Sequence, residues 1–161
     1  MDAHTVLILE HKGEEGTIGE ICLNRPSACH ALTAQMARTI ANALRDWYHR
    51  PDLIAIILRG KGEHFCAGGD LRKLYDSMGR EAVSKDDLFL DEYRLFDFMH
   101  AYPKPIIAFL SGYVLGAGVG LAAQARFRVM THSVQWGMPE LNIGLFPDVG
   151  SRYFLRRISD P

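Results

Sequence analysis

The sequence predicts an α/β protein with a largely parallel sheet. Apolar runs of strand length alternate with helical patterns along the chain, and this alternation is typical of an α/β layer fold. The run at residues 53–58 contains no polar side chain, as expected of a strand covered on both faces. The chain has 161 residues, 48% of them hydrophobic, which is the size and composition of one globular domain. We therefore expect a single domain over residues 1–161.

The first elements follow from local patterns. Strands are expected at residues 6–11 and 17–23, joined by a turn that contains glycine. Apolar side chains at helical spacing predict a helix over residues 33–48, which ends before Pro51. These side chains are Met36, Ile40, Leu44 and Trp47.

A second helix is expected over residues 85–100, with Phe89, Tyr93, Phe96 and His100 on one stripe. Proline at position 105 opens the next apolar run, which predicts a strand over residues 105–110. A short helical pattern follows at residues 121–123, and another at residues 153–157.

Residues 106–123 carry no charge and are long enough to be a candidate membrane span. Glycine recurs at positions 112, 116 and 120, a spacing found in transmembrane helix pairs. However, four glycines and Ser111 lower both the hydrophobicity and the helix propensity of this stretch. A strand, a turn and a buried helix account for it better, and we expect no membrane partner.

Charge and cysteine content exclude several classes of protein. The net charge is −1, with Lys and Arg scattered among acidic residues, so we expect no nucleic-acid partner. The three cysteines, Cys22, Cys29 and Cys66, form no CxxC pair, which argues against a disulfide framework or a zinc site. Residues 1–4 lack a signal-peptide pattern. The expected compartment is the cytoplasm, with the mitochondrial matrix as the alternative.

Two glycine-rich turns follow successive predicted strands, at residues 64–72 and 115–120. Parallel sheets bind ligands at the carboxyl ends of their strands. Neither turn matches a phosphate loop or a dinucleotide fingerprint, and one such turn alone is usually plain turn chemistry. Together they could each direct one backbone N–H group at a single oxyanion.

The order of the motifs resembles the enoyl-CoA hydratase/isomerase (crotonase) superfamily. The motifs are LNRP at residues 23–26 with ALT at 31–33, FCAGGDL at 65–71, LSGY at 110–113 with GAG at 116–118, and MPE at 138–140 with GLFPDVG at 144–150. The resemblance implies a crotonase-like spiral of β-β-α units that binds an acyl-CoA thioester. It also implies that the N–H groups of Gly69 and Ala117 hold the oxyanion, while Gly68, Asp70 and Gly116 contact the substrate.

The last two motifs resemble the 3-hydroxyisobutyryl-CoA hydrolase branch of that superfamily. This implies that Glu140 is the catalytic carboxylate, either attacking the thioester or activating water. Asp148 would bind the substrate's 3-hydroxyl group or protonate the leaving thiolate, and Glu92 would contact the substrate. The implied reaction yields 3-hydroxyisobutyrate and coenzyme A in valine breakdown. No metal or other cofactor is expected, because coenzyme A is part of the substrate.

Some positions favour other interpretations. Gly120 stands where hydratases carry a glutamate, which makes enoyl-CoA hydratase or isomerase activity the second hypothesis. Ala117 replaces the usual glycine, and its Cβ restricts the backbone. On residue type alone, Glu140 and Asp148 would be solvated loop residues. Cys66 beside His64 would be a packed thiol rather than a nucleophile.

The resemblance also implies a missing helical C-terminal region after residue 161, so that only the N-terminal core of the family's fold is expected here. Apolar surface left uncovered would favour a homo-oligomer or a complex with a second polypeptide. The third hypothesis is therefore an inactive fragment that binds coenzyme A or a protein partner.

Overall fold

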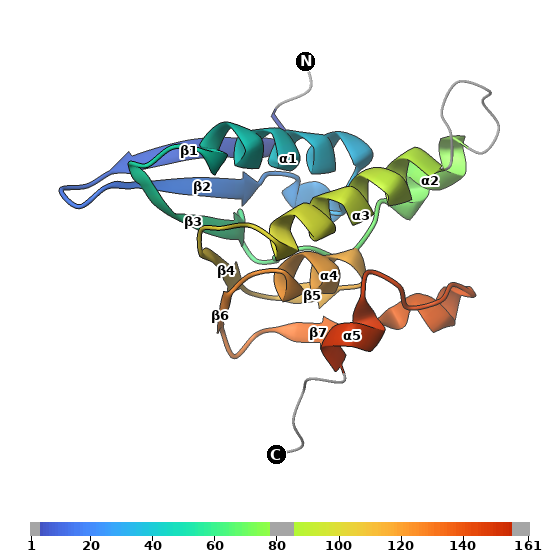
Figure 1. The fold of residues 1–161 in the computed structure, drawn as a ribbon. Coiled ribbons are helices and arrows are strands. Elements are labelled where there is room, and N and C mark those ends of the chain that lie inside the picture. The colour runs from blue at the N-terminus through green and yellow to red at the C-terminus, as the bar shows by residue number, and fades with distance from the viewer. Residues whose placement is uncertain (1–3, 78–85, 156–161) are drawn as a thin grey trace.

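A five-stranded sheet forms the centre of the fold (Figure 1). The computed structural model describes residues 4–77 and 86–155. The strands, in the order β1-β2-β3-β4-β6, are Val6–Lys12, Thr17–Leu23, Leu53–Gly60, Ile106–Leu110 and Phe127–Met130. β1 and β2 are antiparallel, and each later pair of neighbours is parallel. The largely parallel sheet predicted from the sequence is confirmed.

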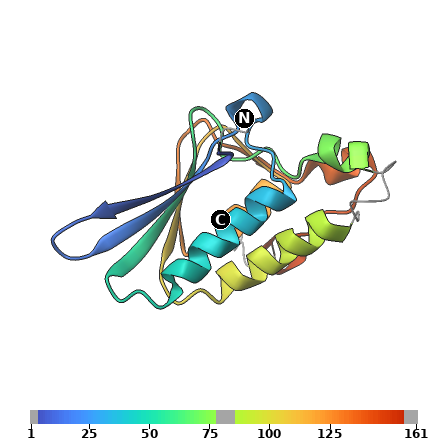
Figure 2. The same ribbon diagram turned by 90° about the horizontal axis from the view of Figure 1, so that it is seen from above.

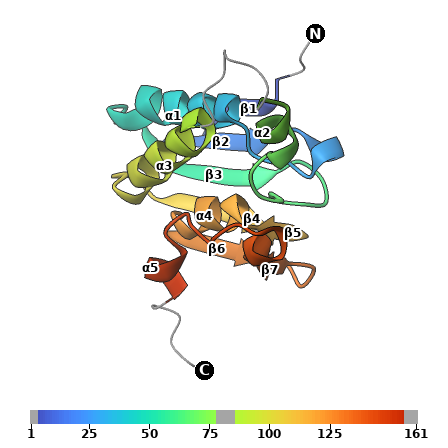
Figure 3. The same ribbon diagram turned by 90° about the vertical axis from the view of Figure 1, so that its right-hand side faces the viewer.

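A second, two-stranded sheet pairs β5 (Tyr113–Leu115) with β7 (Gln135–Gly137) in parallel. One further bridge joins Cys66 to Val114 of β5. In Figure 3 the fold runs from α1 and β1 at the top to β7 and α5 below.

Two long helices lie side by side on one face of the sheet (Figure 2). They are α1 (Ala34–Tyr48) and α3 (Asp86–His100). Lys85, where the sequence places the start of the second helix, lies outside the described residues. The shorter helices are α2 (Leu71–Ser77), α4 (Ala117–Ala123) and α5 (Ser151–Leu155), with 3₁₀ turns η1 (Pro26–Ala28) and η2 (Pro139–Ile143).

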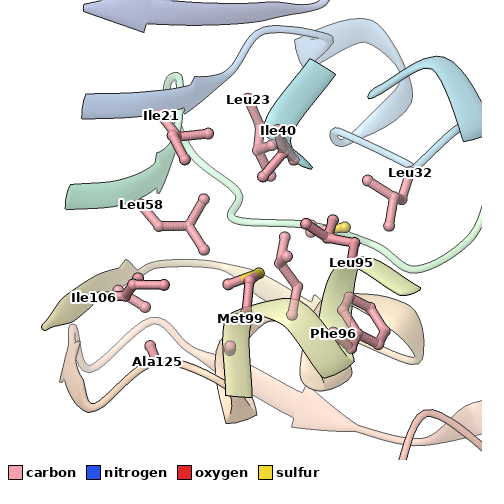
Figure 4. Close-up of a cluster of buried hydrophobic side chains, with 14 of the residues drawn as sticks. Ile21, Leu23, Leu32, Ile40, Leu58, Leu95, Phe96, Met99, Ile106 and Ala125 are labelled. Carbon is pink, nitrogen blue, oxygen red and sulfur yellow. The ribbon is translucent and has the colours of Figure 1, made fainter. Parts of the chain in front are cut away.

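The main core lies between the sheet and these two helices (Figure 4). The predicted face of α1 is confirmed, with all four of its apolar side chains buried. Thr33 caps this helix, and its Oγ1 accepts a hydrogen bond from Met36 N at 3.2 Å. Ile21 and Leu58 of the sheet are also buried. Each such side chain stabilises the fold by about 1.5–3 kcal/mol.

The buried face of α3 differs from the predicted stripe. Tyr93 is 42% exposed and His100 is exposed, whereas Leu95, Phe96 and Met99 are buried. Glu92 lies on the buried face with them and is only 2% exposed. A buried carboxylate of this kind is rare outside functional sites.

Residues 106–123 form β4, β5 and α4, which confirms the strand, turn and helix interpretation. Within the described residues, no helix is long and apolar enough to cross a membrane.

The described chain after α4 is more exposed than the rest. The sequence analysis did not predict β6, β7 or η2, and β6 forms an edge of the sheet with every side chain exposed. The helix predicted at residues 153–157 is described only within α5, because residues 156–161 lie outside the described chain.

Candidate active site

The first glycine turn, residues 68–70, follows the strand β3 and is held by Leu32. The Leu32 amide donates to Gly68 O at 2.7 Å, and the Asp70 amide donates to Leu32 O at 2.8 Å. Gly68 has a φ of +109°, and a methyl group added to it would lie 3.2 Å from Leu115 O. Glycine is therefore required there, both by the backbone angle and by the approach of the second turn.

Asp70 supports this turn instead of lining its open side. Its Oδ2 accepts from Arg25 Nη2 at 2.8 Å, and its Oδ1 accepts from the Lys73 amide at 3.0 Å. The Arg25 amide in turn donates to Nδ1 of the buried His30 at 2.9 Å. Burial lowers the pKa of His30, which favours the neutral ring that this acceptor role requires. Of the predicted substrate contacts, Asp70 therefore has both carboxylate oxygens engaged by the protein itself.

The second turn, residues 115–117, lies directly beside the first. The amide of Leu115 donates to Cys66 O at 3.0 Å, and the amide of Gly116 donates to Gly137 O at 3.0 Å. Gly116 has a φ of +51°, while Ala117 is already the first residue of α4. The left-handed conformation thus falls on Gly116, and the Cβ of Ala117 sits on ordinary helical backbone.

The two predicted oxyanion donors are brought together. A methyl group added to Gly68 would lie 3.8 Å from the Ala117 nitrogen, and one added to Gly116 would lie 3.7 Å from Gly68 Cα. Neither the Gly69 N–H nor the Ala117 N–H donates a hydrogen bond to any described residue. Two unpaired backbone donors at adjacent turns form an arrangement suited to a developing negative charge.

Glu140, on η2, lies against the second turn. A methyl group added to Gly116 would lie 2.5 Å from Glu140 Oε1, so the carboxylate occupies the space that glycine leaves open. Its Oε2 is buried and accepts no hydrogen bond from any described residue. Buried polar atoms are normally paired, and exceptions require an explanation. Residue type alone suggests a solvated loop carboxylate, whereas Glu140 is partly buried and packs against the second turn.

Glu92 reaches the same place from α3. A methyl group added to Gly69 would lie 4.0 Å from Glu92 Oε2. Burial, and then the nearby carboxylates of Asp148 and Glu140, raise the pKa of Glu92 to about 8. Glu92 therefore keeps its proton at neutral pH. Of its two neighbours, Glu140 lies on η2 and Asp148 lies between η2 and α5.

Asp148 accepts a hydrogen bond from the hydroxyl group of Tyr93. Burial, and then this hydrogen bond, raise the pKa of Tyr93, so the phenol stays protonated as the donor. Tyr93 is a site residue that was not predicted from the sequence, because it fits the apolar stripe expected of its helix. The two residues are 55 positions apart, and no local pattern signals such a contact.

The Cys66 thiol is not a competing candidate for the nucleophile. Cys66 is fully buried beneath the first turn, and burial raises its pKa to about 12. A thiol in such surroundings is a poor nucleophile. Among the described residues, no group of three or more His, Cys, Asp and Glu side chains is arranged to hold a metal ion.

Comparison with known proteins identifies the relatives of this chain. The family described as enoyl-CoA hydratase/isomerase matches residues 18–161. The mitochondrial 3-hydroxyisobutyryl-CoA hydrolase of Bos taurus is 42% identical over 158 residues, which are 98% of this chain and 40% of that protein. The mitochondrial 3-hydroxyisobutyryl-CoA hydrolase of Homo sapiens is 40% identical, with the same coverage. The chain thus spans about 40% of the length of these curated relatives.

Solved structures show the same fold. A carnitinyl-CoA dehydratase from Mycobacterium thermoresistibile superimposes with a TM-score of 0.87 at 38% identity, over 96% of this chain and 45% of that one. AtuE from Pseudomonas aeruginosa superimposes with a TM-score of 0.85 at 30% identity, over 96% of this chain and 58% of that one. The crotonase-like α/β fold expected from the motifs is confirmed.

Proposed function

Because the chain belongs to the enoyl-CoA hydratase/isomerase family, we propose that its site hydrolyses the thioester of a short 3-hydroxyacyl-CoA. The observation that carries this proposal is Glu140, whose carboxylate has an unpaired buried oxygen and packs against Gly116, the residue before the unpaired Ala117 donor. The relatives named 3-hydroxyisobutyryl-CoA hydrolase support 3-hydroxyisobutyryl-CoA, an intermediate of valine breakdown, as the substrate.

In this proposal the thioester carbonyl oxygen binds to the Gly69 and Ala117 N–H groups. These donors cost no reorganisation when the carbonyl becomes an oxyanion, since their backbone is already fixed. Glu140 takes a proton from water as the water oxygen bonds to the carbonyl carbon. The carbon–sulfur bond then breaks, and the products are the free acid and the thiol of coenzyme A.

The other two carboxyl groups take different roles because their surroundings differ. Asp148 accepts the hydrogen bond of Tyr93 through Oδ2, and its carboxyl group has further acceptor sites, so we assign Asp148 to accept the substrate's 3-hydroxyl hydrogen bond. Glu92 is protonated at neutral pH and faces the first turn, so we assign it to protonate the leaving thiolate. The reaction involves no oxidation or reduction, and we propose no cofactor beyond the coenzyme A of the substrate.

Glu140 could instead attack the carbonyl carbon itself, which breaks the carbon–sulfur bond and forms an acyl-glutamate anhydride that water then opens. Turnover in ¹⁸O-labelled water, followed by mass spectrometry of the peptide that contains Glu140, tests for this route. Label in the Glu140 carboxylate indicates an anhydride that water opened at the glutamyl carbon, while label in the product alone shows that water bonded to the acyl carbon.

The test of the proposed function is a pair of assays on the purified chain. Free-thiol release from 3-hydroxyisobutyryl-CoA reports hydrolysis, and loss of crotonyl-CoA absorbance reports hydration. We expect thiol release without hydration, because Gly120 supplies no second acid/base group for adding water to a double bond. Hydration without thiol release would instead support enoyl-CoA hydratase activity. Binding of the coenzyme A ester with neither reaction would support a binding function.

A further inference from the structure

Val149 is a buried residue in a largely exposed part of the chain. It is only 5% exposed, whereas Leu141, Ile143 and Phe146 before it are 71%, 55% and 78% exposed. Its φ is +45°, which is unfavourable for a β-branched residue. The Ser151 amide donates to Asp148 O at 2.7 Å and closes a turn around it. A strained, buried side chain that follows Asp148 directly requires a physical reason.

The reason lies on α4, directly opposite. A methyl group added to Gly120 would lie 2.6 Å from Val149 Cβ and 2.8 Å from Phe96 Cε2. Real Cβ atoms do not approach other atoms so closely. Val149 therefore occupies the space that any side chain at position 120 would need, and Phe96 closes that space from α3.

We propose that Val149 is a positioning residue, which holds Asp148 at the carboxyl cluster by packing into the space above Gly120. A side chain at position 120 would then displace Asp148 from its present position. This inference rests on the proposed function, in which Asp148 binds the substrate. It identifies Gly120 as a position that determines which reaction the fold supports, since a carboxylate on α4 and the Asp148 segment would compete for one space.

A displaced Asp148 segment has space to move into. Val149 and Gly150 line a groove of about 1130 Å³ between α3, β6 and α5, together with Phe96 and Tyr93. A side chain at position 120 is therefore expected to push the segment toward this groove and to carry Asp148 away from Glu92.

The titration of Glu92 reports the position of Asp148 without any substrate. The titratable groups that face Glu92 are Asp148 and Glu140 from the segment after β7, Cys66 beneath the first turn, and Tyr93 on its own helix. Cys66 and Tyr93 are neutral over the range in question, because their pKa values are raised. We propose to follow the Glu92 side-chain carboxyl by NMR on protein with ¹³C-labelled glutamate, with Asp148→Asn as the reference for a lost neighbouring charge.

Three variants separate positioning from simple packing. In Gly120→Ala and in Val149→Gly, the Glu92 midpoint is expected to fall toward its value in Asp148→Asn, and thiol release to fall about tenfold. The double variant Gly120→Ala/Val149→Gly replaces the Val149 side chain with a methyl group on the helix and gives position 149 a residue suited to its φ. It is expected to restore both quantities toward wild type. Gly13→Ala, in an open hairpin turn, is the control and should change neither.

A wild-type Glu92 midpoint in folded Val149→Gly would overturn the proposal, because that variant only opens space. Failure of the double variant to restore the midpoint would also overturn it. If Gly120→Ala does not fold, Val149→Gly and the double variant still decide the question. If neither wild type nor any variant releases thiol while the Glu92 midpoints change as expected, the proposed function fails and the positioning role of Val149 stands.

Discussion

The two sides of the candidate site are built differently. The turns at residues 68–70 and 115–117 are tied by backbone hydrogen bonds, and the first is also fixed by the ion pair of Asp70 with Arg25. The segment at residues 138–150, which supplies Glu140 and Asp148, is mostly exposed, and its contacts with the rest of the site include the packing of Val149 and the hydrogen bond from Tyr93. Backbone donors must be fixed before the reaction, because they stabilise charge only where they already point.

This difference predicts that loss of the contacts that fix the turns reduces stability, whereas displacement of the carboxylates of the segment reduces activity. The substitutions below are ordered from the largest expected effect to the smallest.

Arg25→Met removes the cation that pairs with the buried Asp70 carboxylate. The free energy of unfolding should fall by about 3–5 kcal/mol, since an unpaired charge remains in a buried site. Urea denaturation followed by circular dichroism measures the change. The matched control is Arg38→Met, which breaks an exposed ion pair with Asp91 and should cost less than about 1 kcal/mol. Equal losses in the two variants would show that the first turn is not specially fixed.

Gly116→Ala places a methyl group 2.5 Å from Glu140 Oε1 on backbone with a φ of +51°. Displacing the carboxylate should lower kcat/KM for thiol release about a hundredfold. Gly62→Ala also places a side chain on backbone with a positive φ, of +91°, but with open space around the new methyl group. The comparison therefore separates strain from displacement of Glu140, and a similar loss of activity in both variants would contradict the assigned place of that carboxylate.

Glu92 makes stability depend on pH. Its folded pKa of about 8 lies above the ordinary glutamate value, so the folded state binds one proton more than the unfolded state between those values. Stability should then fall as pH rises from about 5 to about 8, by up to about 1.4 kcal/mol per pH unit. Glu92→Gln should remove this slope. Denaturation midpoints that change with pH equally in both proteins would show that the slope arises elsewhere.

Tyr93→Phe removes only the hydroxyl group that donates to Asp148. We expect kcat/KM to fall about threefold to tenfold, in line with one hydrogen bond to a charged group, and the melting temperature to stay near wild type. Tyr75→Phe, at a position 75% exposed, is the control for loss of a tyrosine hydroxyl. A large drop in melting temperature for Tyr93→Phe, but not for Tyr75→Phe, would show that the Tyr93 hydroxyl group contributes to stability, as the contacts of the two turns do.

The same comparison explains what the sequence could predict. Strands such as Thr17–Leu23 were predicted correctly because apolar runs and turn residues are local signals. The two glycine turns were found for the same reason. The roles of Glu140, Asp148 and Glu92 came from the family resemblance, since a carboxylate near a proline is by itself an ordinary loop residue.

Other features required the folded chain. Helical periodicity alone could not show that Glu92 faces inward while Tyr93 stays half exposed, because both fit an amphipathic helix. The Arg25 contact to Asp70 spans 45 positions, and the contact between Gly120 and Val149 depends on how two distant elements pack. Such pairs leave no periodic trace in a single sequence.

The most direct test of the account compares wild type with Glu140→Gln in free-thiol release from 3-hydroxyisobutyryl-CoA, with the exposed Glu15→Gln as the control. Replacing the carboxylate with an amide removes the base or nucleophile while nearly preserving its shape. We predict that wild type and Glu15→Gln turn over, and that Glu140→Gln is slower by a factor of about a hundred or more at an unchanged melting temperature. Thiol release from folded Glu140→Gln at the wild-type rate would contradict the assignment of Glu140 as the catalytic carboxylate.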